Sequence, residues 1–419
     1  MSLDIVDLSL IKTIRMSTMK TAGISGHCDP RFDKVAEIFS SAIESGFEIG
    51  ASLAIEHQGK MVVDLWGGHQ DQEKTKPWQE DTIVNVFSVT KGVVATCAAR
   101  LIEQGLLDIH QKVSHYWPEY GCNGKQDTKV IDLLCHRAGM FGFQEERPID
   151  EWRNWQQFTD LLAAQAPFRE PGASQGYHAL TFGWLVGEVI RRIDGRSVGT
   201  YFSEEIARPL GLDFKIGVDE SDLPRCADTL MLDNKSTLAV LKLISYIPDM
   251  LLSKWLRGVK GVVNSGDYSV AFSARGLDGD DAVNSTEWRL AEVPAANGHG
   301  TAASLAKLYG VMANGGERDN FRLLTPATIE QITSIHSKGP DTVLFGLPYH
   351  FGLGYMVNSP LTPIGSKPRM FGHTGIGGEV TFGDLDNKLG FSFLNNRQHN
   401  LNNLYKTANN LSKALYKIL

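Results

Sequence analysis

Segments with β-strand character lie near both ends of this 419-residue chain, while most segments between them have helical spacing. The apolar runs 49–56 and 60–66 meet at His57-Gln58-Gly59, a pattern typical of a β-hairpin. Further strands are predicted at 82–87, 351–357, 370–378, 380–382 and 389–394. Strands from the two ends can share one sheet only if the chain returns to where it began. We therefore predict an α+β fold: an antiparallel sheet built from both termini and flanked by helices, with a mostly helical region inserted.

Helices are predicted on both sides of these strand segments. Apolar residues recur at helical spacing from 31 to 45, where Gly46 ends the pattern, and a closing helix is predicted at 401–419. We expect residues 1–26 to form a loosely held arm and residues 27–419 to form one domain. Within this domain, a sheet subdomain would take about 27–87 and 297–419, and a helical subdomain about 88–296. The 197–295 part would cover an active site or form its substrate-facing wall.

The composition is that of an ordinary globular protein. Hydrophobic residues make up 42% of the chain and charged residues 21%, with a formal net charge of −7. No block of basic residues resembles a nucleic-acid footprint, so no nucleic-acid partner is expected. Cys28, Cys97, Cys122, Cys135 and Cys226 contain no CxxC pair, which predicts reduced structural thiols rather than a disulfide framework or a zinc site.

Neither a targeting segment nor a membrane span is predicted. The first 26 residues contain acidic side chains and lack an uninterrupted apolar core, and the most apolar long stretch, 238–256, is broken by charges and a proline. We therefore expect a soluble, cytoplasmic protein. His69, His110 and His115 lack the spacing of a metal site, so no metal or cofactor is expected. The sequence leaves the oligomeric state open.

The strongest chemical signal is Ser88 followed by Lys91, at the start of a helix predicted from Ser88 to about Gly105. This spacing places the hydroxyl and the amine on one helix face. A serine at a helix start lies where the dipole favours developing negative charge, and a lysine whose pKa is lowered can accept the serine proton. Alone the motif is weak, because an N-cap serine followed by a solvated lysine looks the same.

Two further segments could complete such a site. Tyr177 could act as a general base if the Lys91 ammonium lowered its pKa, although a tyrosine is more often a packing residue. His373-Thr374-Gly375-Ile376 lies in a Gly-rich strand segment, where another backbone or a ligand can approach closely. The N–H groups of Ile376 and Ser88 could then form an oxyanion hole. The alternative is a β-bulge in a tight sheet corner.

Three other segments have structural explanations at least as good as functional ones. His136 and Arg137 lie between an apolar run and a glycine, which favours helix-end packing. His178 could contact substrate, but a structural hydrogen bond is equally consistent. Asn297-Gly298-His299-Gly300 is expected to cap the helix that begins at 302 rather than to bind phosphate, because it lacks the P-loop lysine.

The order of these elements resembles the penicillin-recognising serine hydrolases, the superfamily of β-lactamases and D-alanyl-D-alanine peptidases. More narrowly, the chain is similar to the class C β-lactamase-related esterases, the family VIII carboxylesterases. The resemblance covers residues 30 to 415 and implies a β-lactamase-like domain over 27–419. It is carried by the segments Phe87–Lys91, Leu133–Gly139, Pro171–Ala179, Asn297–Thr301 and Phe371–Gly375.

The resemblance implies a role for each matching residue. Ser88 would be the acylated nucleophile, with Lys91 and Tyr177 as the proton-transfer pair. The backbone N–H groups of Ser88 and Ile376 would form the oxyanion hole. His373, Thr374 and Gly375 would line the substrate site from the sheet edge.

Two departures from the class C β-lactamase pattern bear on the substrate. Ala179 stands where those enzymes generally have an asparagine, and His373 stands where they usually have a lysine. Both changes weaken recognition of an acylamino-carboxylate, since histidine is mostly neutral at pH 7. We therefore expect a serine carboxylesterase that acts on a small-molecule ester through an acyl-enzyme. A β-lactamase, a D-amino peptidase, an acyltransferase and a non-catalytic binding protein remain alternatives.

Overall fold

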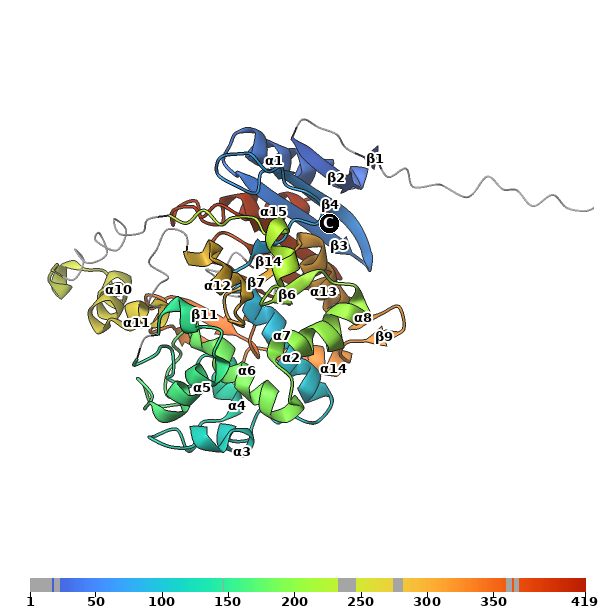
Figure 1. Cartoon of the computed structure of the whole chain (residues 1–419). Helices are drawn as coiled ribbons and strands as arrows, with labels where there is room; N and C mark the ends of the chain where they lie inside the picture. The colour runs from blue at the N-terminus through green and yellow to red at the C-terminus, as the bar shows by residue number, and fades with distance from the viewer. Residues whose placement is uncertain are drawn as a thin grey trace, which may run out of the picture.

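The two ends of the chain meet in one sheet. The structure, a computed structural model, describes residues 17–18, 23–145, 147–232, 246–273, 282–358, 364 and 369–419. Figure 1 shows the N-terminal part (blue) and the C-terminal part (red) together at one end of the molecule, with the helices of the middle (green) at the other. This arrangement confirms the predicted α+β fold with a helical insertion.

In the described part of the chain, the main sheet has ten strands in the order β1-β2-β4-β3-β15-β14-β13-β12-β11-β10. All neighbouring strands are antiparallel. The N-terminal and C-terminal parts join where β3 pairs with β15, with Leu53 opposite Phe393. The strands are β1 (Ser17–Thr18), β2 (Ile24–Cys28), β3 (Gly50–His57), β4 (Lys60–Gly68), β10 (Ser337–Pro340), β11 (Pro348–Phe351), β12 (Met356–Val357), β13 (Met370–Thr374), β14 (Val380–Asp384) and β15 (Leu389–Asn395).

The predicted hairpin is confirmed. Gln58 and Gly59 connect β3 to β4 with φ angles of +51° and +77°. Two successive left-handed residues match the twist of a tight two-residue turn, and a glycine at the second position lowers its cost. His57 pairs directly with Lys60 across the turn.

Helices cover both faces of the sheet. Leu53 and Ile55 of β3 belong to the cluster that contains Phe39 and Leu411, from α1 (Asp33–Glu44) and α15 (Lys406–Leu415). Ala54, which points to the opposite face, belongs to the cluster of α13 (Ala302–Ala313) and α2 (Val89–Glu103). With both faces covered, all seven residues of β15 are buried.

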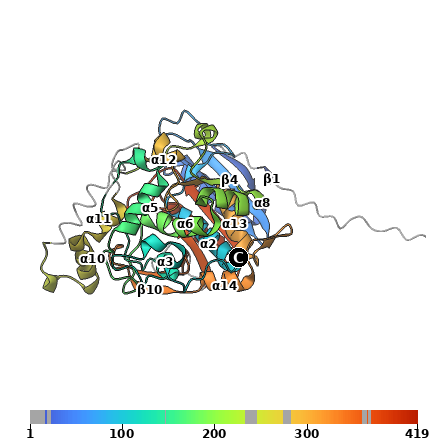
Figure 2. The same cartoon turned by 60° about the horizontal axis from the view of Figure 1, so that its bottom comes forward.

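The inserted region is mostly helical, as predicted. In both views α10 and α11 lie at the periphery of the molecule (Figures 1 and 2). The remaining α-helices of the described residues are α3 (Val113–Tyr116), α4 (Val130–Leu134), α5 (Trp155–Ala164), α6 (Thr181–Asp194), α7 (Val198–Phe202), α8 (Arg208–Leu210), α10 (Lys254–Ser265), α11 (Asp267–Phe272), α12 (Thr286–Leu290) and α14 (Pro326–Thr333). The pair β8 (Glu317–Arg318) and β9 (Phe321–Arg322) forms a small separate sheet.

Several strand predictions need correction. Residues 298–300 form β7 (Gly298–Gly300), paired with β5 (Val84–Asn85) and β6 (Phe214–Ile216), rather than a helix cap. Thr301 instead caps α13, because its side chain accepts from the N–H of Ser304. The strand predicted at 351–357 is split between β11 and β12. The strand predicted at 370–378 ends at Thr374, and the glycines after it form a turn.

Part of the segment predicted as an N-terminal arm belongs to the main sheet. Residues 24–28 form β2, which pairs with β4, and Ile24 and Cys28 are buried. The expectation of a loose arm is therefore wrong at residues 24–26, while residues 1–16 and 19–22 lie outside the described residues. Among the helices that the structure describes, none combines the length and apolar character needed to cross a bilayer.

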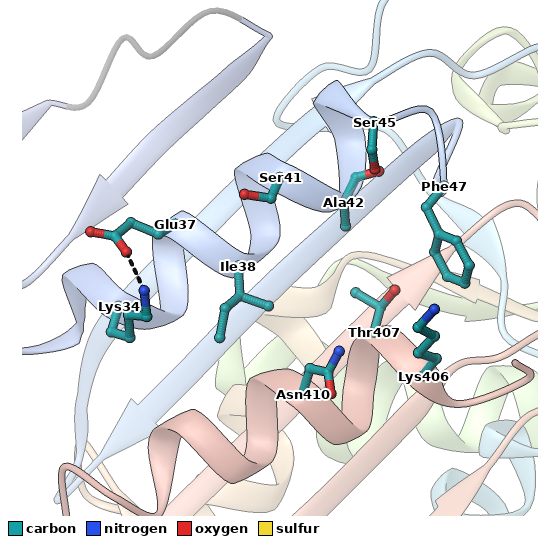
Figure 3. Close-up of a pocket in the computed structure, with 10 residues that line it drawn as sticks. All are labelled: Lys34, Glu37, Ile38, Ser41, Ala42, Ser45, Phe47, Lys406, Thr407 and Asn410. Atoms are coloured by element: carbon teal, nitrogen blue, oxygen red, sulfur yellow. Dashed lines mark hydrogen bonds and ion pairs between the residues drawn. The ribbon is translucent and has the colours of Figure 1, made fainter.

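A groove of about 330 Å³ lies between α1 and α15. Figure 3 shows Ile38 and Ala42 of α1 facing Thr407 and Asn410 of α15, with Lys34 and Glu37 paired at one end. Thr407 also donates to the buried carboxyl of Glu48 at 2.6 Å. None of the predicted site residues lines this groove.

Candidate active site

Ser88 lies at a sharp turn between β5 and α2. Phe87, the residue before it, has a φ of +44°, which is unfavourable for a bulky side chain and stores strain at this turn. The predicted helix is confirmed: α2 begins at Val89. Ser88 is partly exposed, and its side chain makes no capping hydrogen bond to the helix. The hydroxyl is therefore not engaged as an N-cap.

Thr90 fixes this turn to the small sheet. Its hydroxyl donates to the carbonyl of Phe87 at 2.6 Å and accepts from the N–H of Gly298 at 2.9 Å. A Cβ on Gly298 would lie 2.7 Å from that hydroxyl, so the contact requires glycine. The Asn297–Thr301 segment thus supports the turn that carries Ser88.

Lys91 is fully buried beside Ser88. Its Nζ lies 3.0 Å from Ser88 Oγ, 2.7 Å from the carbonyl oxygen of Ala179 and 2.9 Å from that of Ala295. Burial lowers the pKa of Lys91 well below its ordinary value. Burial therefore favours the neutral amine over the ammonium.

Tyr177 packs against the same amine. The Lys91 Nζ lies 4.8 Å from the centroid of the Tyr177 ring, which is also 4.7 Å from the His136 ring. The Tyr177 N–H donates to Asp341 Oδ1 at 3.1 Å. This carboxyl oxygen also accepts from the N–H groups of Val343 and Leu344, so it ties the tyrosine to a distant loop.

The pKa of Tyr177 is shifted in the direction opposite to the one a catalytic phenolate would need. Burial raises the pKa of Tyr177 well above 10, and a hydrogen bond with Ser88 only partly offsets this. The expected lowering by a Lys91 ammonium fails because the lysine is itself driven towards its neutral form. Tyr177 is therefore a neutral phenol at pH 7.

Three buried histidines, His136, His178 and His373, lie near Tyr177 and differ in which ring nitrogens have hydrogen-bond partners. His178 Nε2 accepts from the Met140 N–H at 3.1 Å and its Nδ1 lies 2.7 Å from the Gly176 carbonyl. Both nitrogens thus have backbone partners, which supports the structural explanation for His178. His136 Nδ1 accepts from the His178 N–H at 3.1 Å, and the His136 ring packs on Tyr177. His136 therefore makes specific contacts in addition to the helix-end packing predicted from the sequence.

His373 comes from β13 on the opposite side of the site. Its ring centroid is 6.1 Å from that of Tyr177, and its Nδ1 lies 2.9 Å from the Thr374 carbonyl. Its Nε2 is buried and has no hydrogen-bond partner among the described residues. Burial lowers the pKa of His373 to about 3, so the ring is neutral at pH 7. Next to it, the Thr374 hydroxyl accepts from the Tyr405 hydroxyl at 3.2 Å.

The turn after β13 approaches the Ser88 segment closely. A Cβ on Gly375 would lie 2.8 Å from the carbonyl oxygen of Val86, two residues before Ser88. In the described part of the chain, neither the Ser88 N–H nor the Ile376 N–H donates to another protein group. Gln398 holds the other side of the same peptide segment by donating to the Ile376 carbonyl at 3.0 Å. Within the described residues, both N–H groups are therefore unused as donors.

Asp341 and the carbonyls of Ala179 and Ala295 were not predicted from the sequence. Asp341 lies in a loop that carries no motif; its only signal is a short acidic side chain at a turn, where such residues accept local N–H groups. The described residues contain no group of three or more His, Cys, Asp or Glu side chains that could hold a metal ion. All five cysteines are free, and four are buried.

Known proteins are similar to this chain along most of its length. The beta-lactamase family model matches residues 35–414. The esterase/beta-lactamase LipL of Mycobacterium tuberculosis (strain ATCC 25618 / H37Rv) is 35% identical over 378 residues, which are 89% of this chain and 83% of that protein.

Two solved structures are similar along nearly the whole chain. A family VIII carboxylesterase matches with a TM-score of 0.82 and 34% identity, covering 94% of this chain and 100% of the other. A penicillin-binding protein homologue from Caulobacter crescentus matches with a TM-score of 0.81, 35% identity and the same coverage. The predicted resemblance is thereby confirmed, and the chain belongs to the beta-lactamase family of hydrolases.

Proposed function

We propose that this hydrolase is a carboxylesterase that forms an acyl-enzyme on Ser88. The observation that carries the proposal is the set of three contacts made by the Lys91 amine. A neutral amine has two hydrogens and one lone pair. Donating the hydrogens to the carbonyls of Ala179 and Ala295 leaves the lone pair to accept the Ser88 hydroxyl hydrogen at 3.0 Å.

The chemistry follows from this geometry. Ser88 Oγ attacks the ester carbonyl while its proton passes to Lys91, and the resulting oxyanion accepts from the N–H groups of Ser88 and Ile376. The proton is then delivered to the leaving alcohol, with the Tyr177 phenol as the relay. Water hydrolyses the acyl-serine by the reverse proton path, which releases the acid and restores Ser88.

Two residues favour esters over β-lactams. Ala179 has no side-chain amide to hold an acylamino group, and the neutral His373 offers no fixed positive charge to a carboxylate. The similarity to an esterase/beta-lactamase and to a family VIII carboxylesterase supports the same substrate class.

The decisive experiment replaces the nucleophile. Ser88→Ala should reduce hydrolysis of p-nitrophenyl butyrate by about 10³-fold or more, and the wild-type protein should gain one acyl group on Ser88 by mass spectrometry. Ser285→Ala is a matched control, because Ser285 caps α12 by accepting from the Trp288 N–H at 3.2 Å. Full activity in Ser88→Ala would overturn the proposal.

The alternatives give different outcomes in the same assays. Nitrocefin turnover that exceeds ester turnover would favour a β-lactamase, an alternative supported by the similarity to the esterase/beta-lactamase LipL. A non-catalytic binding protein would fail to react with a fluorophosphonate probe.

A further inference from the structure

Glu379 is a buried carboxyl enclosed by the turn that carries Ile376. Its carbonyl accepts from the Gly375 N–H at 2.8 Å, and its Oε2 accepts from the Gly377 N–H at 3.1 Å. A Cβ on Gly375 or Gly377 would lie 2.1 or 2.3 Å from the carboxyl oxygens. The carboxyl thus fills the space beside both neighbours of Ile376, and only glycines fit there.

The outer side of the turn is held by amides. Gln398 donates to the Ile376 carbonyl at 3.0 Å, and Asn395 donates to the Gly377 carbonyl at 3.3 Å. The direction of the Ile376 N–H is therefore fixed between two amides on one side and the Glu379 carboxyl on the other.

We propose that Glu379 is a positioning residue for the oxyanion donor at Ile376, and that it works only as the neutral acid. This inference rests on the proposed function. Glu379 Oε1 is buried and has no hydrogen-bond partner in the described part of the chain, an arrangement that is costly for a carboxylate. Ionisation would also place a negative charge beside the site where the oxyanion develops.

The surroundings of Glu379 agree with a neutral resting state. Burial, with a contribution from the Glu48 carboxylate, raises the pKa of Glu379 to about 8. Two further titratable groups face this region: Tyr405, whose own pKa is raised by burial and in part by Glu379, and His399, which lies 3.2 Å from Glu48. The charge on Glu379 therefore changes within a pH range that an esterase assay reaches.

The test is the pH dependence of kcat for p-nitrophenyl butyrate between about pH 6 and pH 10, after subtraction of spontaneous hydrolysis. For the wild type we expect kcat to fall at alkaline pH by about 3- to 10-fold, with little change in KM, since the charge weakens one donor without removing it. Glu379→Gln keeps the shape without the charge. It should abolish this alkaline loss while keeping kcat near pH 7 within about threefold of wild type.

Glu292→Gln is the matched control. Glu292 is another carboxyl whose pKa is raised by burial, but it accepts from Ser197 and Gly199, outside the site. It should keep the wild-type pH profile. An alkaline loss in Glu379→Gln equal to that of the wild type would overturn the inference. A wild-type kcat that stays constant through pH 9.5 would also overturn the inference. This second measurement does not depend on whether a variant folds. Both outcomes leave the inactivity of Ser88→Ala, and hence the proposed function, untouched.

Discussion

The amine of Lys91 lies 3.0 Å from the hydroxyl of Ser88, and its other two partners are main-chain carbonyls rather than a carboxylate. Carbonyls stabilise an ammonium much less than a carboxylate does, so burial dominates and lowers the pKa of Lys91. A general base placed next to its nucleophile needs this protonation state. The lysine is therefore the expected proton acceptor, and the tyrosine, with its raised pKa, is the expected donor.

The first prediction concerns Lys91. Because only the neutral amine has a lone pair, kcat of the wild type should fall as the pH decreases through the lowered pKa of Lys91. Lys91→Arg keeps a permanent cation and should lose about 10²- to 10⁴-fold in kcat at every pH. Lys125→Met is the control, since Lys125 is also buried and donates to the carbonyls of Ala163 and Gln165 rather than contacting a serine hydroxyl. An active Lys91→Arg enzyme would contradict the role of Lys91 as the proton acceptor.

Tyr177→Phe tests the phenol. We expect kcat to fall by about 10- to 10³-fold, by the same factor at pH 6 and pH 8, because a phenol with a raised pKa stays protonated over that range. A loss that grows with pH would instead identify a phenolate base. Tyr309→Phe is the matched control: its pKa is likewise raised by burial, and its hydroxyl has no partner among the described residues.

The sequence predicted the features that depend on local spacing. The helix face shared by Ser88 and Lys91 and the turn at Gln58-Gly59 need only neighbouring residues, and both were predicted. β7 was missed because Gly-His-Gly has no strand propensity of its own, and its pairing with β5 and β6 comes from distant segments.

The electrostatics of the site could not be predicted from spacing. The interaction of Asp341 with Tyr177 spans 164 residues, and no motif marks it. A lowered pKa of Tyr177 would require a charged Lys91, whereas complete burial moves both groups towards neutrality. Burial of a side chain is a property of the assembled fold, so the direction of these shifts needed the structure.

Gly375→Ala tests the close approach of the turn after β13 to the Ser88 segment. The added Cβ would lie 2.1 Å from Glu379 Oε2 and 2.8 Å from the Val86 carbonyl. We expect a loss of about 1–3 kcal/mol in the free energy of unfolding and a lower kcat, measured by urea denaturation and ester hydrolysis. Gly258→Ala is the control, because a Cβ added at this helical position would meet no atom within 4 Å. It should retain the stability and the kcat of the wild type. Wild-type stability and kcat in Gly375→Ala would show that the turn can relax.

The last prediction concerns stability and Glu379. Its pKa is raised from 4.5 to about 8 in the folded protein, so between these values the folded state holds a proton that the unfolded state has lost. This contribution to stability is fully present below pH 4.5 and is lost as the pH rises through 8. The loss amounts to at most roughly 5 kcal/mol by linkage. The glutamine in Glu379→Gln cannot ionise, so this variant should not show that loss of stability. Between about pH 5 and about pH 9, the unfolding free energy measured by urea denaturation should therefore decrease less for Glu379→Gln than for the wild type. Equal decreases in the two proteins would show that another group titrates.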